Sequence, residues 1–335
     1  MTTDNYPILA PGLKIGTEMP ATASDDFLTF LTQLGVQYVY TWFPQWLCNY
    51  DYISYFKEKV ESYGITLFNA GGFHIAKDAR FQLALSGRDE AIDHFANFLT
   101  LLGKIGVHTT TFTWEPDAVW ASDWKKPGRG GALARSVDLA ILNKQEYTHE
   151  RQFSLEETWG NYTYFIQKVL PIAEANGVRL ALHPNDPPVE SIAGIPSLIR
   201  NAECYERAFE IGNSAFLGME FCCGCWLEGG AAFGDLYEGI RHFVKEEKIF
   251  IVHFRNVSAR LPSFDETFID EGYGNMFEIM KTFLSTGYNG TLVLDHTPKM
   301  VASAGFYAET AFAVGYIKSL LNCAQQVLEC EKRVA

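Results

Sequence analysis

The sequence lacks both a long hydrophobic run and an excess of positive charge. No stretch approaches the roughly 18 continuous apolar residues of a membrane-spanning helix. The first residues, MTTDNYPILAPG, have neither a basic start nor a hydrophobic signal core. The net charge of −13 disfavours nucleic-acid and anionic-membrane partners. We therefore expect a cytoplasmic protein that acts on a small polar molecule, with no nucleic-acid partner and no membrane.

Low-complexity tracts and Pro/Gly/Ser-rich linkers are also absent, and the seven cysteines are too scattered for a disulfide framework. Their odd number indicates reduced thiols, of which Cys222, Cys223 and Cys225 form a cluster. The 335 residues, 47% of them hydrophobic, can bury a large core. We therefore predict one domain over residues 1–335.

Short apolar or β-branched runs alternate with amphipathic stretches along the chain, and this pattern predicts eight βα units. Eight units in sequence favour a single (β/α)8 TIM barrel of the α/β class over a doubly wound sheet. Capping residues support the helices: Ser24 precedes two aspartates, and Ser154 is followed by Glu157 three positions later. The predicted strands are 13–17, 36–42, 66–70, 108–114, 179–183, 216–222, 249–254 and 291–296. The predicted helices lie near 24–34, 51–63, 88–104, 154–175, 196–211, 234–245, 275–286 and 306–324.

Residues 115–151, after the fourth predicted strand, form the one long irregular region. Structureless loops longer than about 12 to 15 residues are uncommon in compact domains and are usually functional. The loops that follow barrel strands also carry the active site of this fold. We expect a lid or specificity loop here, with a plain surface excursion as the alternative.

The fifth to eighth predicted strands each end at or beside a residue that can bind a metal. The runs RLALH, FLGMEFC, FIVHF and TLVLD place His183, Cys222, His253 and Asp295 at strand ends that converge on one barrel mouth. Such a mixed N/S/O set suits a divalent first-row metal such as Mn, Fe, Co or Zn. Each residue alone could instead be a satisfied core histidine or a buried apolar cysteine. Spacing alone therefore leaves a metal site and a chance placement equally open.

The segments around these residues resemble those of mannonate dehydratases, a family of xylose-isomerase-like TIM barrels. The similar segments are LHPNDPP (182–188), CCGC (222–225), VHFRNV (252–257) and LDH (294–296), with weaker similarity over FTWEPDAVWASDW and FDETFIDEGYGNM. The resemblance implies that a divalent metal, Mn²⁺ or Fe²⁺, is bound by His183, Cys222, His253 and Asp295.

The chain departs from the family pattern at three places near these residues. Asn185 stands where the family has an aspartate, Cys225 stands where it has a serine, and Thr297 stands where it has a glycine. The metal ligands are unchanged. The departures therefore bear on which substrate is bound.

The resemblance implies dehydration of a sugar acid, such as D-mannonate, to a 2-keto-3-deoxy acid. The metal would stabilise charge on the substrate oxygens, while a base and an acid move protons. The expected catalytic residues are His296 and Tyr307, the latter in the segment GFY (305–307), with the acid and base roles unassigned. The structural alternatives are a partner that orients Asp295, for His296, and a rim aromatic, for Tyr307.

Other residues are expected to line the substrate pocket. Arg255 lies two positions after His253 and should point to the same side of the strand. It could hold a substrate carboxylate by a bidentate pair, or form a salt bridge to Asp186 or Glu220. Further substrate contacts are expected at Asn185, Asp186, His74 and Trp114.

Two other functions stay open at this point. One is a metal-dependent sugar isomerase or epimerase, in which the metal bridges a carbonyl and a hydroxyl. The other is a barrel that binds sugar acids without catalysis. The oligomeric state is also open, with a homodimer as one option.

Overall fold

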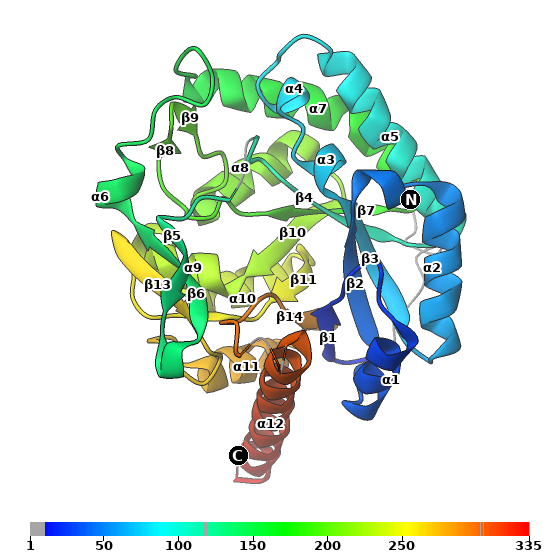
Figure 1. The fold of residues 1–335 in the computed structure, drawn as a ribbon, viewed down its shortest axis with the longest axis vertical. Helices are drawn as coiled ribbons and strands as arrows, with labels where there is room; N and C mark the ends of the chain where they lie inside the picture. Colours follow the sequence, from blue (N-terminus) through cyan, green and yellow to red (C-terminus); the bar gives the residue numbers. More distant parts are fainter. Residues whose placement is uncertain (1–10, 117–118, 302, 304, 335) are drawn as a thin grey trace.

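A parallel sheet of eight strands forms the centre of the molecule, in a computed structural model that describes residues 11–116, 119–301, 303 and 305–334 (Figure 1). The strands follow the order β3-β2-β1-β14-β11-β10-β7-β4, and contacts between β3 and β4 bring the two edges together into a barrel. All eight predicted strands are confirmed. They are β1 (Lys14–Glu18), β2 (Tyr38–Phe43), β3 (Thr66–Gly72), β4 (Thr109–Thr113), β7 (Arg179–His183), β10 (Leu217–Cys222), β11 (Ile249–His253) and β14 (Thr291–Leu294).

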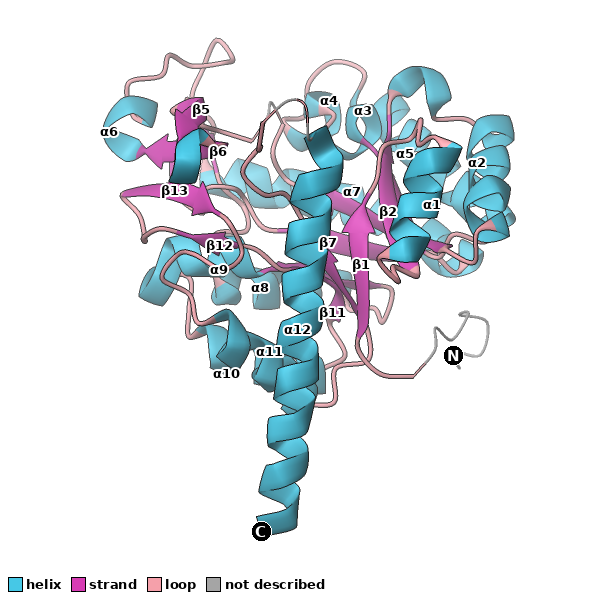
Figure 2. Ribbon diagram, turned by 60° about the horizontal axis from the view of Figure 1, so that its bottom comes forward, coloured by secondary structure: helices cyan, strands magenta, loops and turns pink. Residues whose placement is uncertain are grey.

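Helices surround this barrel, and each predicted helix has a counterpart. They are α1 (Asp25–Gln33), α2 (Tyr50–Ser62), α5 (Arg88–Ile105), α7 (Leu155–Asn176), α8 (Ala202–Gly212), α10 (Leu236–Lys245), α11 (Met276–Ser285) and α12 (Gly305–Val334). The predicted start of α8 was six residues early, because residues 195–196 pair as strand β9. Helix α12 continues ten residues past its predicted end and projects beyond the barrel (Figure 2).

The expected capping interactions are present. The Ser24 side chain accepts a hydrogen bond from the backbone N–H of Phe27 at the start of α1. At the start of α7, Ser154 and Glu157 form a reciprocal capping box. These local interactions fix where each helix begins, and so where the preceding loop returns to the barrel.

A second, antiparallel sheet lies beside the barrel and corrects the prediction that residues 115–151 are irregular. Its order is β12-β13-β6-β5, and β6 pairs with β13 in the register Ser263↔Asp138. The pairing of β6 with β13 could not be predicted from local sequence, because the two strands are more than a hundred residues apart, whereas the other partner of β6, β5, is close by in the chain. We call it the lid sheet: β5 (Asp123–Pro127), β6 (Leu133–Asp138), β12 (Asn256–Val257) and β13 (Ser263–Thr267).

Shorter elements complete the fold. They include α3 (Phe73–Ala76), α4 (Ala79–Gln82), α6 (Leu139–Leu142), α9 (Cys223–Gly229), β8 (Ser191–Ile192) and β9 (Ile195–Pro196). Within the described residues, no helix is both long and apolar enough to cross a bilayer. That residues 1–335 fold as one domain stays a prediction.

Candidate metal centre

Three of the four predicted metal ligands converge at the barrel mouth. His183 ends β7, Cys222 ends β10 and His253 ends β11, and these strands are neighbours in the sheet. One ligand atom from each residue lies within 4.8 Å of the others. The register explains this convergence, because Cys222 lies directly beside His253. The three side chains form a mixed nitrogen and sulfur group that we call the metal triad.

Asp295, the fourth predicted ligand, lies beside the triad but is turned partly away. It follows β14, the strand next to β11, and its Oδ1 lies 3.5 Å from Nδ1 of His253. Its Oδ2 accepts a hydrogen bond of 2.9 Å from Nε of Arg255. The carboxylate therefore has one oxygen near the triad and the other held by an arginine.

The Cys222 thiol of the triad is held in the form that suits a metal. Burial by itself would raise the pKa of the Cys222 thiol, but contacts with Cys225, Arg255 and the two triad histidines hold that pKa well below its usual value. A thiolate is the form in which cysteine binds metals. Nδ1 of His183 lies 2.7 Å from the Pro184 carbonyl oxygen, so Nε2 is the ring nitrogen left for a metal. The ring nitrogens of His253 lie beside carboxylates, with Nε2 at 2.6 Å from Glu220 and Nδ1 at 3.5 Å from Asp295. A borderline divalent ion fits these donors.

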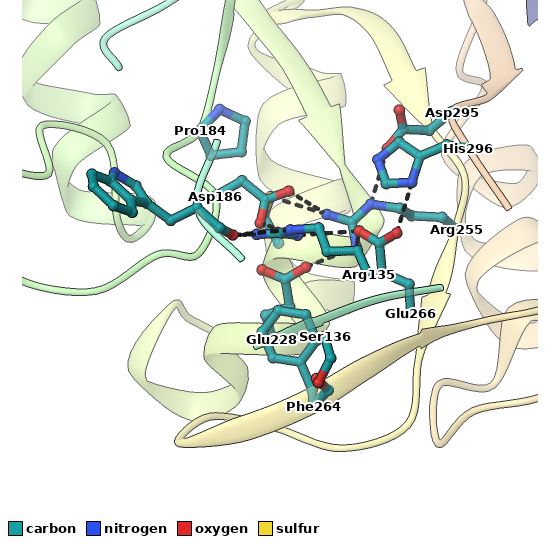
Figure 3. A network of polar contacts seen from close by, with 12 residues as sticks. Arg135, Ser136, Pro184, Asp186, Glu228, Arg255, Phe264, Glu266, Asp295 and His296 are labelled. Atoms are coloured by element: carbon teal, nitrogen blue, oxygen red, sulfur yellow. Dashed lines mark hydrogen bonds and ion pairs between the residues drawn. The ribbon is translucent and has the colours of Figure 1, made fainter. Parts of the chain in front are cut away.

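Arg255 does not face a free substrate site as predicted; it forms the alternative salt bridge to Asp186. The side chain is 2% exposed, and its guanidinium also binds Glu228 and Asp295 (Figure 3). The distances are 2.7 Å to Asp186, 2.7 Å to Glu228 and 2.9 Å to Asp295. With its three nitrogens already engaged, Arg255 has no free pair of N–H groups for a substrate carboxylate.

Arg135 is a second buried arginine at this mouth, and the sequence analysis missed it. It comes from β6 of the lid sheet, and its Nη1 lies 2.7 Å from Asp186 and 3.1 Å from Glu266. Its Nε and Nη2 donate to the Trp120 carbonyl oxygen at 3.0 and 2.6 Å. No local pattern marks this residue, because only the pairing of β6 with β13 carries it into the barrel mouth.

His296 stands at the rim of the same network. Nδ1 lies 2.8 Å from Glu266 and Nε2 lies 3.2 Å from Asp295, while the side chain is 46% exposed. Desolvation would lower the pKa of His296, but the carboxylates of Asp295 and Glu266 raise it to about 9. The side chain is thus an imidazolium at neutral pH, beside Asp295 and open to solvent.

Asn185 and Asp186, both predicted substrate contacts, bind protein groups in this structure. The Asn185 side chain donates to the Trp114 carbonyl at 2.9 Å and accepts from the Ile199 N–H at 2.8 Å. Asp186 is held between Arg135 and Arg255. The two residues hold together the loops after β4 and β7, and they line a small pocket with Glu115 and Trp120.

The structure places Trp114 and His74, both predicted substrate contacts, away from the metal triad. Trp114 is 1% exposed and packs on Phe81, Tyr162 and Phe165, between the barrel and its helices. The position after β4 turns the ring outward, toward α4 and α7. His74 instead lines a separate cleft, together with residues of α5 that include His94.

The structure also does not bring Tyr307 into the site. The ring is 42% exposed at the start of α12 and packs edge-on against Phe27 and Phe30 of α1, with centroid distances of 5.4 and 4.8 Å. The helix turns this residue toward α1 in the outer layer, away from the metal triad.

Two further acidic residues lie at the mouth: Glu18, which was not expected there, and Glu220, which was expected only as a possible partner of Arg255. Glu18 ends β1 and accepts a hydrogen bond of 3.3 Å from the Tyr40 hydroxyl. Burial, followed by the charge of Asp295, raises the pKa of Glu18 to about 7. Glu220 lies on β10, is 1% exposed and approaches His253 to 2.6 Å. A charged residue within or at the end of an apolar strand run was the available signal in both cases.

Comparisons with known proteins identify the family of this chain. A family model described as D-mannonate dehydratase (UxuA) matches residues 138–331, which contain the whole metal triad and Asp295. The mannonate dehydratase of Oceanobacillus iheyensis is 30% identical over 306 residues, covering 81% of this chain and 85% of the relative.

Solved structures show the same fold. The mannonate dehydratase from Streptococcus suis serotype 2 superposes with a TM-score of 0.84 at 23% identity, covering 94% of this chain and 96% of that one. A xylose isomerase domain protein from Planctomyces limnophilus superposes with a TM-score of 0.64 at 15% identity, covering 95% and 100%. Since the family model matches more than half of the sequence, this chain belongs to the D-mannonate dehydratase family of hydro-lyases, in a xylose-isomerase-like TIM barrel.

Proposed function

We propose that this chain is a metal-dependent hydro-lyase that converts D-mannonate, or a closely related sugar acid, to a 2-keto-3-deoxy acid. The observation that carries the proposal is the convergence of His183, Cys222 and His253 at the barrel mouth of a D-mannonate dehydratase family member. The family is metal-dependent, and the triad is one of two His/Cys/Asp/Glu groups among the described residues that could hold an ion.

We propose His183, Cys222, His253 and Asp295 as the metal ligands and Mn²⁺ or Fe²⁺ as the metal. When bound, the ion would act as a Lewis acid toward the substrate carboxylate and its neighbouring hydroxyl. Arg255 has a supporting role: its hydrogen bond to Oδ2 of Asp295 leaves Oδ1 on the side of the triad. Arg135 and Asp186 in turn fix Arg255.

Dehydration needs a base that removes the proton beside the carboxylate and an acid that protonates the leaving hydroxide. His296 suits the acid, because it is solvent-accessible and its pKa of about 9 keeps it protonated at neutral pH. Glu18 suits the base, because its pKa of about 7 leaves a large ionised fraction at that pH. Tyr307 is not assigned a role, since it packs on α1.

A screen of aldonic acids with Mn²⁺ and Fe²⁺, read out as the 2-keto-3-deoxy product, tests the function. We expect turnover of D-mannonate or a stereoisomer by the wild type and its loss in Cys222→Ser. Activity on a ketose but on no aldonic acid would favour the isomerase alternative. Metal-dependent binding of an aldonic acid without turnover would favour the non-catalytic barrel.

Three further expectations stay predictions. They are the cytoplasmic location, the homodimer and the role of residues 115–151 as a lid or specificity loop. Light scattering on the purified protein tests the homodimer. The lid sheet supports the lid or specificity role, since Arg135 reaches from it into the charged network.

A further inference from the structure

Trp42 is an aromatic side chain at the barrel mouth to which the proposed chemistry gives no role. It lies near the end of β2, two residues after Tyr40, so the two side chains share one face of the strand. Tyr40 points into the barrel, where its ring lies 5.6 Å from the ring of His253 and its hydroxyl donates to Glu18. Trp42 packs against the same interior cluster of side chains. It therefore points inward as well, one layer nearer to the mouth.

The indole ring of Trp42 is held in place by β3 and the turn that follows it. Trp42 lies beside Gly71 in the register of β2 and β3. A Cβ atom at Gly71 would lie 2.6 Å from two carbons of the ring, so the glycine leaves space that the ring needs. Phe73 stacks on the indole with a centroid distance of 4.4 Å and an angle of 17° between the ring planes. We call Trp42 and Phe73 the aromatic wall.

The aromatic wall lies across the barrel mouth from the metal triad. In the closed order of the sheet, β2 is four strands from β10 in either direction, and β3 is four strands from β11. Both contacts that hold the indole come from the β3 side, while β1, which ends at Glu18, is the other neighbour of β2. Trp42 is only partly buried, and Phe73 is 51% exposed. The wall thus presents aromatic surface to the space between the proposed base and the triad.

The chemistry of the wall complements the part of a sugar acid that a metal does not bind. The carboxylate and its neighbouring hydroxyl are the groups proposed to meet the ion. The remaining carbons carry C–H groups as well as hydroxyls, and aromatic rings pack against such apolar surface while they exclude water. An uncharged wall opposite the charged groups would therefore bind the distal carbons.

We propose that Trp42, backed by Phe73, binds the distal carbons of the sugar acid and sets the preferred chain length, an inference that rests on the proposed function. A six-carbon acid held by its carboxylate end at the triad extends toward the wall, whereas a shorter acid makes less contact with it. Trp42 is thus a specificity-determining residue that touches the substrate away from the reacting bonds.

The test compares D-mannonate with the five-carbon acid that has the same configuration at carbons 2 to 4. Turnover and calorimetric binding of each acid are measured with Mn²⁺ for wild type, Trp42→Ala and Trp42→Phe. Trp46→Ala is the matched control, because Trp46 follows the same strand but is 77% exposed. Thermal melts check that each variant folds.

We expect Trp42→Ala to raise KM and Kd for D-mannonate by roughly 10-fold, and those for the five-carbon acid by less than about 3-fold. Because the wall touches carbons that do not react, kcat should change less than KM. Trp42→Phe, which keeps an aromatic ring, should lie between wild type and Trp42→Ala. Trp46→Ala should match the wild type for both acids.

Two results would overturn the inference while leaving the proposed function intact. One is an unchanged ratio of the two acids in a folded Trp42→Ala variant, which would make Trp42 a packing residue only. The other is the same loss in Trp46→Ala. A wild-type protein that binds and converts no aldonic acid would instead contradict the proposed function, and this inference with it.

Discussion

The metal triad and the charged network around Arg255 share one barrel mouth but are built in different ways. The triad comes from the ends of three neighbouring strands, β7, β10 and β11. The network draws Arg135 from β6 and Glu266 from β13, both in the lid sheet, and joins them to residues that follow barrel strands. The barrel strands therefore bring the triad together, while the lid sheet adds Arg135 and Glu266 to the charges around it.

The two groups also differ in charge balance. Burial and the neighbouring Asp186 raise the pKa of Glu228 well above its usual value. The network carboxylates face Arg135, Arg255 and the His296 imidazolium. Arg255 of the network also helps to hold the pKa of the Cys222 thiol low, so the two groups are electrostatically linked. The triad differs from the network in that it offers thiolate and imidazole donor atoms, which suit a divalent ion.

The largest effect is expected from Cys222→Ser, which breaks the triad and leaves the network intact. A serine hydroxyl is a poor metal ligand. Replacing a residue that only supports a metal ligand lowers metal affinity or activity by up to about 100-fold, so losing a direct ligand should lower Mn²⁺ affinity and turnover by at least that factor. The free energy of unfolding of the metal-free protein should change by less than about 1 kcal/mol. Unchanged metal affinity, measured by calorimetry, would remove Cys222 from the site.

Arg135→Leu breaks the network from the lid side. Removing one partner of a buried charge cluster typically costs about 3–5 kcal/mol, so urea unfolding should show a loss of that order. Proteolysis within the segment of β5 and β6 should also become faster.

Arg129→Leu is the matched control in the same segment. Arg129 pairs with Asp270 at 2.8 Å but is 41% exposed. An exposed pair contributes about 0–1 kcal/mol, so this variant should stay near the wild type. Equal losses in both variants would contradict the distinction between buried and exposed arginines.

Acid sensitivity should also separate the network from the triad. Burial would raise the pKa of Glu266, but His296 and Arg255 lower it to about 2. A depressed folded-state pKa contributes stability above the unfolded value near 4.3, and that contribution is lost as pH falls toward 2. Between pH 6 and pH 2.5, Glu266→Gln should therefore lose less unfolding free energy than the wild type, by about 2 kcal/mol. If the unfolding free energies of wild type and Glu266→Gln fell in parallel with pH, the depressed pKa of Glu266 would be contradicted.

The smallest effect is expected from Tyr307→Phe, because Tyr307 belongs to neither the metal triad nor the charged network. The ring packs on Phe27 and Phe30, and phenylalanine preserves that packing. Turnover of the aldonic acid substrate should stay within about 2-fold, and stability within about 0.5 kcal/mol. His296→Gln serves as the comparison and should lose most of the turnover. A large loss of turnover in Tyr307→Phe would show that the tyrosine hydroxyl acts in catalysis.

Residues whose placement follows from a strand end could be predicted from the sequence. His183, Cys222 and His253 end strands of buried apolar residues, and parallel strands bring such ends together. Trp114 also follows a strand directly, yet its ring packs outward on α4 and α7. A strand end fixes where the backbone lies but not which side the next side chain takes.

Residues placed by long-range pairing could not be predicted. Arg135 enters the site because β6 pairs with β13, more than a hundred residues later. Tyr307 lies outside the site because α12, near the C-terminal end of the chain, packs against α1, near the N-terminal end. In both cases the contact joins two segments far apart in the chain, and neither segment's sequence predicts that it will pack against the other.

The sequence by itself determined the eight barrel strands, the surrounding helices and the identity of the four candidate ligands, because hydrophobic periodicity and capping act over a few residues. Only the tertiary structure decided how the charges at the mouth are shared. Arg255 binds Asp186, Glu228 and Asp295, and Glu220 meets His253 inside the barrel. The physical reason is that electrostatic partners are chosen by proximity in the folded chain, after packing has brought distant strands and loops together.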